Sequence, residues 1–267
     1  MYSEDEIISM WSADMYDLDE TDVTDVNFAM SIIGPFSKRI LEVACGSGRY
    51  LVPLAKAGHN VIGLDFDEFM LKKIEAKLDG RENVEWRKSD IIKDKWELGF
   101  DVVLLAANIL FNIVSDVEYE KAQKLLIEKS AKSLLPGGHL LIDYGYTIYP
   151  EKWYDNPEPN LVWEGTDSHG NIGKMILLDS KFNKMNGTCT FVRRYEITSE
   201  KGSSIVRDIP TQKHFATLMQ IQEWLSNYGF VIEGEWGDYE RNPIGENTNR
   251  AIIWARKVKR RDDFDME

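Results

Sequence analysis

The chain has 267 residues, of which 43% are hydrophobic and 29% charged, and its formal net charge is −13. Such a composition is typical of a folded globule with a sizeable core, and the acidic balance argues against nucleic acids and anionic membranes as partners, because that binding depends on Lys and Arg. No apolar run approaches the ~20 residues of a membrane span, and the N-terminus lacks a basic-then-apolar leader. The two cysteines fit a reducing compartment. A cytoplasmic protein is therefore predicted.

The first 37 residues are strongly acidic. They contain nine Asp or Glu residues and no Lys or Arg, while apolar residues recur at a helical spacing between Ile7 and Ile33. We therefore expect one or two amphipathic helices that end at Gly34-Pro35. The acidic residues predict either a solvated face or a field that attracts a cationic substrate.

A strand, a glycine turn and a helix are predicted next. Ile40–Ala44 is apolar apart from Glu42 and is typical of a strand buried on both faces. Gly46 and Gly48 follow, and an amphipathic helix begins near Leu51. Glycine permits backbone torsions that a side chain forbids and lets a ligand approach the main chain. This turn therefore either holds a small polar ligand at the carboxyl edge of a parallel sheet or simply connects strand to helix.

Two ligand classes use a turn of this kind. The dinucleotide fingerprint Gly-x-Gly-x-x-Gly is incomplete here, because Leu51 occupies its third glycine position. Glu42 would also repel a pyrophosphate, whereas it suits a ligand with an ammonium group. The stretch Leu41–Gly48 resembles motif I of the class I S-adenosylmethionine-dependent methyltransferases, acid-x-Gly-x-Gly-x-Gly, with Ala44 in place of the first glycine.

The second strand, Asn60–Leu64, ends at an acidic residue. Asp65 lies 17 positions after Gly48, near the spacing of about 20 residues at which a carboxylate commonly holds a ribose diol. Asp67 can cap the helix expected over Asp67–Leu78, and this leaves Asp65 for the ribose.

The third strand, Val84–Lys88, leads to Asp90 and Ile91. A carboxylate here can accept a hydrogen bond from an adenine amino group while the isoleucine packs on the ring, and in the resembled family this is the adenine position. An ordinary loop aspartate before a turn is the alternative.

The fourth and fifth strands flank a long helix. Phe100–Ala106 reads as a fully buried strand. The stretch Ala107–Asn112 after it is expected to form a wall of the cofactor and substrate pocket, with Ala107, Asn108 and Phe111 as cofactor-binding residues. A helix over Asp116–Leu134 is predicted to stop at Leu-Pro-Gly-Gly, before a strand over His139–Tyr144. The order of these features also resembles the same methyltransferases.

An antiparallel insertion is predicted after the fifth strand. Its short strands are expected at Leu161–Trp163, Lys174–Phe182, Thr188–Thr198 and Ile205–Ile209, with Asn186-Gly187 as a strong hairpin signal. Such an insertion usually carries substrate choice or a dimer contact, and its edge strands could pair with a second copy of the chain.

The core then resumes. The pattern Thr217-x-x-Gln220 is typical of a helix start, and Gly229 is expected to stop that helix. Phe230–Glu235 and Ala251–Arg256 are predicted to form a final antiparallel hairpin.

The resemblance implies an α/β, Rossmann-like fold: a seven-stranded, mostly parallel sheet of order 3-2-1-4-5-7-6 with an antiparallel β-meander inserted after strand 5. The expected parts are an N-terminal helical cap (1–37), a core that binds S-adenosylmethionine (38–150 and 211–258), an inserted substrate, lid or dimerisation subdomain (151–210) and a charged tail (259–267).

The resemblance is closest to small-molecule enzymes such as amino-sugar and glycine or sarcosine N-methyltransferases. It implies methyl transfer from S-adenosylmethionine to a small molecule, with an amine as the expected acceptor. A homodimer is one of the assemblies that the chain could form. O-methylation and non-catalytic cofactor binding stay open. Asn108-Ile109-Leu110-Phe111 differs from the Asn or Asp-Pro-Pro-aromatic motif of DNA amino-methyltransferases, and no His-x-x-x-His or cysteine pair indicates a metal.

Two sets of site residues are predicted. The candidate bases for the acceptor are Tyr16, Tyr144, Tyr146 and His214. The expected cofactor-binding residues are Tyr16, Glu42, Ala44, Cys45, Gly46, Gly48, Asp65, Phe66, Met70, Asp90, Ile91, Ala107, Asn108 and Phe111.

Overall fold

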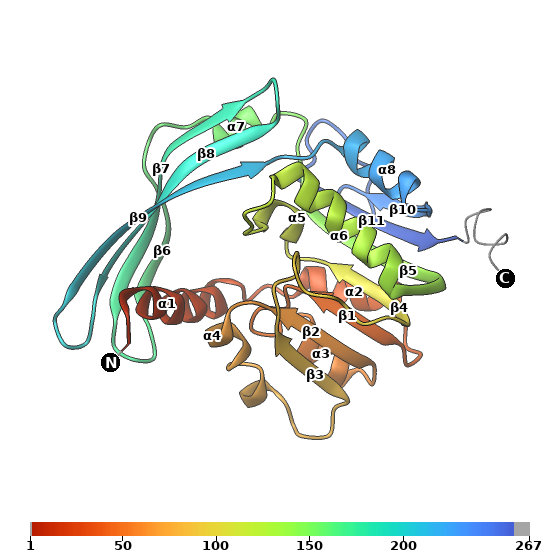
Figure 1. Ribbon diagram of the computed structural model, residues 1–267, viewed down its shortest axis with the longest axis horizontal. Helices are drawn as coiled ribbons and strands as arrows, with labels where there is room; N and C mark the ends of the chain where they lie inside the picture. The colour runs from red at the N-terminus through yellow and green to blue at the C-terminus, as the bar shows by residue number, and fades with distance from the viewer. Residues whose placement is uncertain (1, 259–267) are drawn as a thin grey trace. The chain divides into compact units, whose positions relative to one another are not determined.

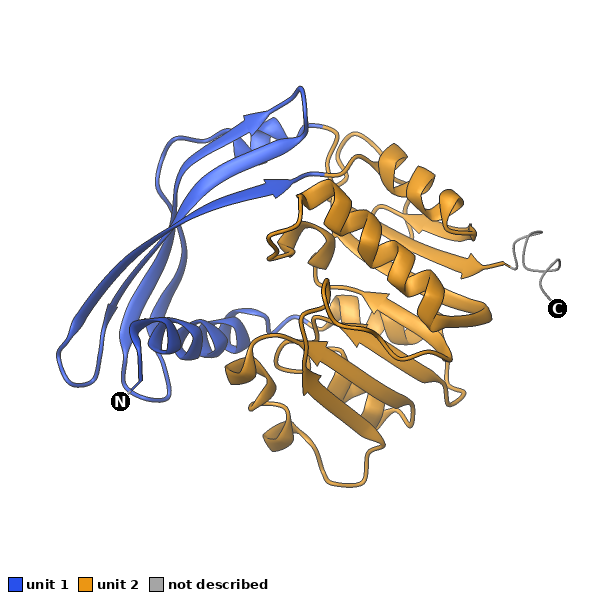
Figure 2. Cartoon of the chain, viewed as in Figure 1, with its two compact units in different colours: residues 1–22, 149–215 blue, residues 23–148, 216–267 orange. Residues whose placement is uncertain are grey.

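The structure is a computed structural model that describes residues 2–258. The chain divides into two compact units, Met1–Asp22 with Tyr149–Phe215 and Val23–Ile148 with Ala216–Glu267 (Figure 2). The division falls after Asp22 and not after residue 37, so the second half of the predicted cap belongs to the larger unit. The predicted tail, residues 259–267, lies outside the described residues.

The larger unit contains a seven-stranded sheet (Figure 1). Its strands are β1 (Arg39–Val43), β2 (Asn60–Asp65), β3 (Val84–Lys88), β4 (Phe100–Leu105), β5 (Leu134–Gly145), β10 (Phe230–Trp236) and β11 (Arg250–Lys257). They are ordered β10-β11-β5-β4-β1-β2-β3. The strands from β1 to β5 pair in parallel, whereas β11 is antiparallel to both β5 and β10. The predicted order 3-2-1-4-5-7-6 is confirmed, with β11 as strand 7 and β10 as strand 6.

Helices cover both faces of this sheet. They are α2 (Thr24–Ile33), α3 (Leu51–Lys56), α4 (Glu68–Leu71), the 3-10 helix η1 (Glu75–Lys77), α5 (Ile109–Asn112), α6 (Tyr119–Ser133) and α8 (Leu218–Asn227). Helices α6 and α8 pack together on one face, and α2 and α3 lie on the other (Figure 1). Helix α3 approaches β2 closely, because a Cβ on Gly63 would lie only 2.3 Å from Leu51 Cδ1.

Three elements of the larger unit differ from the prediction in extent, and in the meander the strand predicted over Ile205–Ile209 runs on to His214. The expected helix over Asp67–Leu78 is two short turns, α4 and η1, because an α-turn followed by a 3-10 turn buries Leu71 and Ile74 as well as a continuous helix would. Helix α6 starts at Tyr119, three residues later than predicted. Strand β5 starts at Leu134, which pairs with Phe100, so the Leu-Pro-Gly-Gly stretch is part of the strand and not a separate stop.

The smaller unit is a helix packed on an antiparallel sheet. It contains α1 (Glu4–Asp19), α7 (Glu151–Tyr154) and a sheet of order β6-β7-β8-β9, with β6 (Asn160–Thr166), β7 (Ile172–Asn183), β8 (Thr188–Thr198) and β9 (Ser204–His214). Each neighbouring pair is antiparallel, which confirms the predicted meander.

Helix α1 is held by a tryptophan. A capping box between Ser3 and Glu6 begins the helix. Trp11 is fully buried, stands edge-on to Tyr195 with ring centroids 6.4 Å apart, and donates a hydrogen bond from Nε1 to the carbonyl oxygen of Gly165 at 3.1 Å. Apolar contacts of this kind fix α1 on the meander, since an isolated helix of this length is marginal in water.

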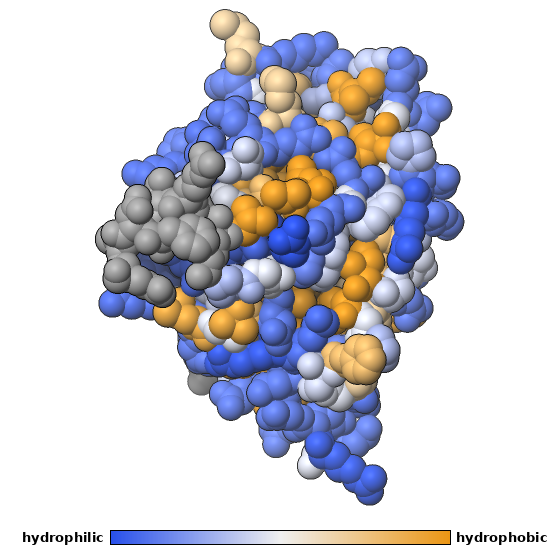
Figure 3. Space-filling view, turned by 90° about the vertical axis from the view of Figure 1, so that its right-hand side faces the viewer, coloured by the Kyte–Doolittle hydropathy of each residue, from blue (hydrophilic) through white to orange (hydrophobic). Residues whose placement is uncertain are grey.

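Apolar residues on the surface are dispersed on one face of the molecule. Figure 3 shows them as separate patches among hydrophilic residues. Across residues 2–258, none of the helices combines the length and the apolar character that crossing a membrane requires.

Candidate active site

The turn after β1 holds unusual backbone torsions. Ala44, Gly46 and Gly48 have positive φ values of 59°, 53° and 86°. A Cβ on Gly48 would also lie 3.0 Å from the side chain of Val52 and 3.2 Å from that of Ile74, so glycine is needed there for both torsion and space. Ala44 adopts a torsion that L-residues seldom occupy, and such strain is concentrated at functional sites.

Asp65 connects the end of β2 to this turn. One carboxylate oxygen accepts a hydrogen bond from the backbone N–H of Gly46 and the other from that of Asp67, both at 2.8 Å. Burial raises the pKa of Asp65, and these backbone donors act in the opposite direction. Asp67 caps α4 through a hydrogen bond from the N–H of Phe69 at 2.8 Å, which confirms its predicted capping role. The Asp65 carboxylate is therefore fixed at the edge of the sheet.

Glu42 is an acidic residue inside the sheet. It is only 4% exposed, and its Oε2 has no hydrogen-bond partner among the described residues. Burial is the main reason that its pKa lies well above the ordinary value, and the nearby charge of Asp65 acts in the same direction. A buried polar atom without a partner is costly, so a ligand that brings a cation or a donor to Glu42 would offset that cost.

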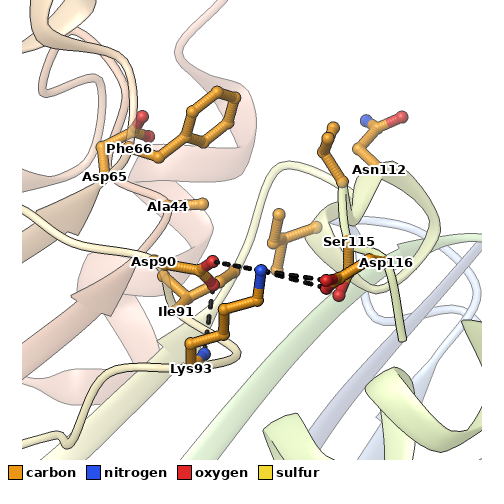
Figure 4. Close-up of a pocket in the computed structure, with 11 residues that line it drawn as sticks. Ala44, Asp65, Phe66, Asp90, Ile91, Lys93, Asn112, Ser115 and Asp116 are labelled. Carbon is orange, nitrogen blue, oxygen red and sulfur yellow. Dashed lines mark hydrogen bonds and ion pairs between the residues drawn. The ribbon is translucent and has the colours of Figure 1, made fainter.

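A cavity of about 350 Å³ lies at the carboxyl edge of the sheet (Figure 4). It is lined by Ala44, Asp65, Phe66, Asp90, Ile91, Lys93, Ile109, Asn112, Val114, Ser115 and Asp116. The first five of these residues are predicted cofactor residues. They come from the turns after β1, β2 and β3, which the parallel pairing of these strands brings to one edge.

The opposite wall comes from residues 109–116, between β4 and α6. A wall from the segment after β4 was predicted, but its cofactor residues were named as Ala107, Asn108 and Phe111, whereas the lining extends to Asp116. The segment reaches this edge of the sheet because β4 pairs with β1 in parallel.

Lys93 joins the two walls. Its Nζ lies 3.1 Å from Asp116 Oδ1 and 3.8 Å from Asp90 Oδ2 (Figure 4). The hydrogen bond between Lys93 and Asp116 is the main reason that the pKa of the lysine is raised and that of the aspartate lowered. The side chains in these pairs are largely exposed, and pairs of this kind are weak and screened by salt.

The other predicted cofactor residues of the larger unit do not line this cavity. The side-chain Oδ1 of Asn108 accepts a hydrogen bond from the N–H of Gly145 at 3.1 Å, which ties the segment after β4 to the end of β5. Cys45 and Phe111 are buried and Met70 is half-buried. Burial raises the pKa of the Cys45 thiol well above its ordinary value, which does not favour a reactive thiolate.

The four candidate bases fall into two groups. Tyr144 and Tyr146 are buried residues of the larger unit, and burial is the main reason that the pKa of Tyr146 is raised. Tyr16 and His214 belong to the smaller unit, on α1 and at the end of β9. His214 pairs in register with Thr188 and is 5% exposed, so it is part of the meander and not of the core segment in which it was expected. Their roles toward a substrate stay predictions.

Comparisons with known proteins agree with this geometry. Residues 40–138 match the methyltransferase domain family. Over 234 residues the chain is 24% identical to YqeM of Bacillus subtilis (strain 168), a protein provisionally named as a methyltransferase, and the match covers 84% of this chain and 86% of that one. Over 209 residues it is 32% identical to phosphoethanolamine N-methyltransferase 1 of Triticum aestivum, covering 70% of this chain and 41% of that one.

A solved structure shares the fold over nearly the whole chain. The CcbJ methyltransferase from Streptomyces caelestis has a TM-score of 0.70 to this chain at 20% sequence identity, covering 92% of this chain and 96% of that one. The sheet order, the strained turn at its carboxyl edge and the matched domain together define the class I methyltransferase fold. The chain is therefore an S-adenosylmethionine-dependent methyltransferase with this fold, and S-adenosylmethionine is its cofactor.

Proposed function

We propose that the cavity of the larger unit receives the adenosine part of S-adenosylmethionine. Asp65 accepts hydrogen bonds from the ribose hydroxyls, and Asp90 accepts one from the adenine amino group. Ile91 and Phe66 pack against the purine. The observation that carries this assignment is the presence of two separate carboxylates, at the ends of neighbouring strands, in one cavity with an apolar side.

The local hydrogen bonds support both carboxylates as acceptors. The Oδ1 of Asp90 accepts from the backbone N–H groups of Ile92 and Lys93 at 2.9 and 3.1 Å, so the loop itself orients the side chain. Asp65 is likewise oriented by two backbone donors. Each oxygen of Asp65 accepts one of these bonds and has a second lone pair, and in Asp90 both bonds go to Oδ1 and leave Oδ2 for the ligand, so each carboxylate has room for a ligand hydroxyl or amine.

The methionine end is assigned to the turn after β1. Glu42 offers an oxygen without a partner to the ammonium group, and Gly46 and Gly48 let the ligand approach the main chain. When bound, the cofactor supplies an electrophilic methyl group on a sulfonium centre. The remaining task of the chain is to align an acceptor atom with that methyl group and to exclude water.

We infer that the acceptor is the nitrogen of a small-molecule amine. The support is the name of the wheat relative, an N-methyltransferase of an amine, and the chemistry, because a neutral amine needs a weaker base than a hydroxyl does. The acidic N-terminus gives less support than its sequence suggests. Asp25 is paired with Arg49, and Glu4 with Arg207, so these charges are neutralised within the chain.

A panel of matched acceptors tests this function. Each pair consists of an amine and the same compound with a hydroxyl in its place, for instance amino sugars and their parent sugars, with release of S-adenosylhomocysteine as the readout and proton NMR of the new methyl group to identify the acceptor atom. We expect turnover with amines and not with their hydroxyl partners. Turnover confined to hydroxyl compounds would assign O-methylation. Tight binding of S-adenosylmethionine without turnover on any acceptor would assign a non-catalytic binder.

A further inference from the structure

The loop between β3 and β4 is folded on itself. We call residues 89–96 the adenine loop, because they carry Asp90 and Ile91. Asp94 Oδ2 accepts hydrogen bonds from the N–H of Asp90 at 2.8 Å and from Ser89 Oγ at 3.1 Å. The N–H of Asp94 in turn donates to the carbonyl oxygen of Asp90 at 2.8 Å. These bonds fold the loop locally, while the carbonyl oxygens of Ile91, Ile92 and Asp94 accept hydrogen bonds from side chains.

Lys129 of α6 supplies most of these side-chain donors. Its ammonium group donates to the carbonyl oxygens of Ile91 at 2.6 Å, Ile92 at 3.1 Å and Asp94 at 2.6 Å. An ammonium group has three protons, so this contact uses its full donor capacity. Hydrogen bonds with a charged donor are stronger than neutral ones. One side chain from a helix thus holds three carbonyl groups within four residues of the loop.

Trp96 completes the support. Its indole Nε1 donates to the same carbonyl oxygen of Ile91 at 3.0 Å, and the Lys129 ammonium lies 4.9 Å from the centroid of its ring. A cation over an indole face is a favourable contact. Lys129 itself is not among the residues that line the cavity, so its influence on a ligand must pass through the loop.

We propose that Lys129 is a positioning residue that sets the affinity of the enzyme for the adenine base by fixing the backbone of the adenine loop. This inference rests on the adenosine site of the proposed function. With Ile91 anchored at its carbonyl oxygen, the Ile91 side chain and the Asp90 carboxylate are held ready for the ring before the ligand arrives. Preorganisation of this kind increases affinity, because the loop is already ordered in the free protein and loses little conformational entropy when the ligand binds.

The test compares two ligands that differ only in the base. S-adenosylhomocysteine and S-ribosylhomocysteine, which lacks adenine, are titrated by calorimetry into the full chain and its variants. For Lys129→Met we expect S-adenosylhomocysteine to bind about tenfold more weakly and S-ribosylhomocysteine to bind within about twofold of the unaltered chain. Lys129→Arg keeps a charged donor and is expected to recover most of the loss. Lys121→Met is the matched control, because Lys121 is an exposed lysine of the same helix.

The outcomes separate the two claims. Equal weakening of both ligands in Lys129→Met, or no weakening of either, would overturn the positioning role while leaving the adenosine site intact. If the unaltered chain does not prefer the adenine-bearing ligand, the adenosine site itself is wrong and the role of Lys129 falls with it. Should Lys129→Met not fold, Trp96→Phe replaces it, since that change removes the indole donor to Ile91 and keeps an aromatic ring beside the Lys129 ammonium. A smaller, adenine-specific loss is then expected, and an unchanged preference for adenine would overturn the inference.

Discussion

Three non-glycine residues at the carboxyl edge of the sheet have left-handed backbone torsions: Ala44, Ala107 and Asn108. Each such torsion costs the folded chain about 1 kcal/mol. They follow β1 and β4, the neighbouring strands at which the order of the sheet reverses. Ligands of open α/β folds bind at this reversal, so the strain lies where a binding role can explain it.

Replacement of Ala44 by glycine should relieve part of this strain. We expect Ala44→Gly to raise the free energy of unfolding by about 0.5 kcal/mol, because the relief in the folded state exceeds the added flexibility of the unfolded chain. Urea denaturation measures it. Ala57→Gly is the control, since Ala57 has an ordinary φ of −75° and should lose stability on the same change. A loss for Ala44→Gly equal to that of the control would show that the torsion carries no strain.

At the scale of elements, a buried network connects α2, the turn before α3, β5 and β11. Tyr50 donates to Asp25 at 2.6 Å, and its hydroxyl lies 3.4 Å from Asp143. Asp143 also accepts from Tyr239 at 2.8 Å and from Arg250 at 2.5 Å. Burial raises the pKa of Asp143, and Arg250 acts in the opposite direction. The arginine therefore favours the charged form of a carboxyl group that is only 3% exposed.

Loss of Arg250 should leave Asp143 without its cation. We expect Arg250→Met to lower the free energy of unfolding by about 3 kcal/mol at pH 7, and by less at pH 5, where the carboxyl can be protonated. Arg256→Met is the matched control, because its ion pair with Glu233 is on the surface, and it should change stability by at most about 1 kcal/mol. Similar effects of the two changes would contradict the account of the network.

Strand β9 carries a buried lysine whose pKa predicts a pH effect. Lys213 is 1% exposed, and burial, together with the charge of Arg193, lowers its pKa from 10.5 to about 8. Between these two values the unfolded chain binds more protons than the folded one, so this lysine makes the free energy of unfolding rise with pH.

Lys213→Met should remove that rise. Urea denaturation at pH 7, 8.5 and 10 is expected to show the variant more stable than the unaltered chain at pH 7, by up to about 3 kcal/mol, with the difference shrinking as the pH increases. Lys201→Met, at an exposed lysine of the same unit, should run parallel to the unaltered chain. Parallel curves for Lys213→Met as well would refute the assigned pKa.

Elements were predictable where local chemistry determines them. Local torsion or hydrogen bonding determines the structure at three such places: the glycines at 46 and 48, the cap at Asp67 and the hairpin at Asn186-Gly187. The helix expected over Asp67–Leu78 was wrong, because an apolar spacing of three or four residues is satisfied equally by α4 and η1. Strand β5 was predicted too short, since Pro136 and glycines usually end pairing, whereas here Leu134 still pairs with Phe100.

At the scale of the whole molecule, the cavity is a product of topology. Its walls come from the segments after β1, β2, β3 and β4, which the sheet order places side by side. Asp65 and Asp90 were predictable because each follows a strand end in a familiar order. Val114 and Ser115 were not, because only the pairing of β4 with β1 brings their segment opposite those carboxylates. The role of Lys129 could not be predicted for the same reason, since its partners are backbone atoms 35 to 38 residues away in the sequence.

The central claim is that the carboxylates of Asp65 and Asp90 hold the adenosine of the cofactor in this cavity. Calorimetric titration of S-adenosylhomocysteine into the unaltered chain, Asp65→Ala and Asp90→Ala tests it most directly, with thermal unfolding to confirm that the variants fold. We predict one ligand bound per unaltered chain and binding at least about tenfold weaker in each variant. Absence of binding to the unaltered chain, or equal affinity in all three proteins, would contradict the account.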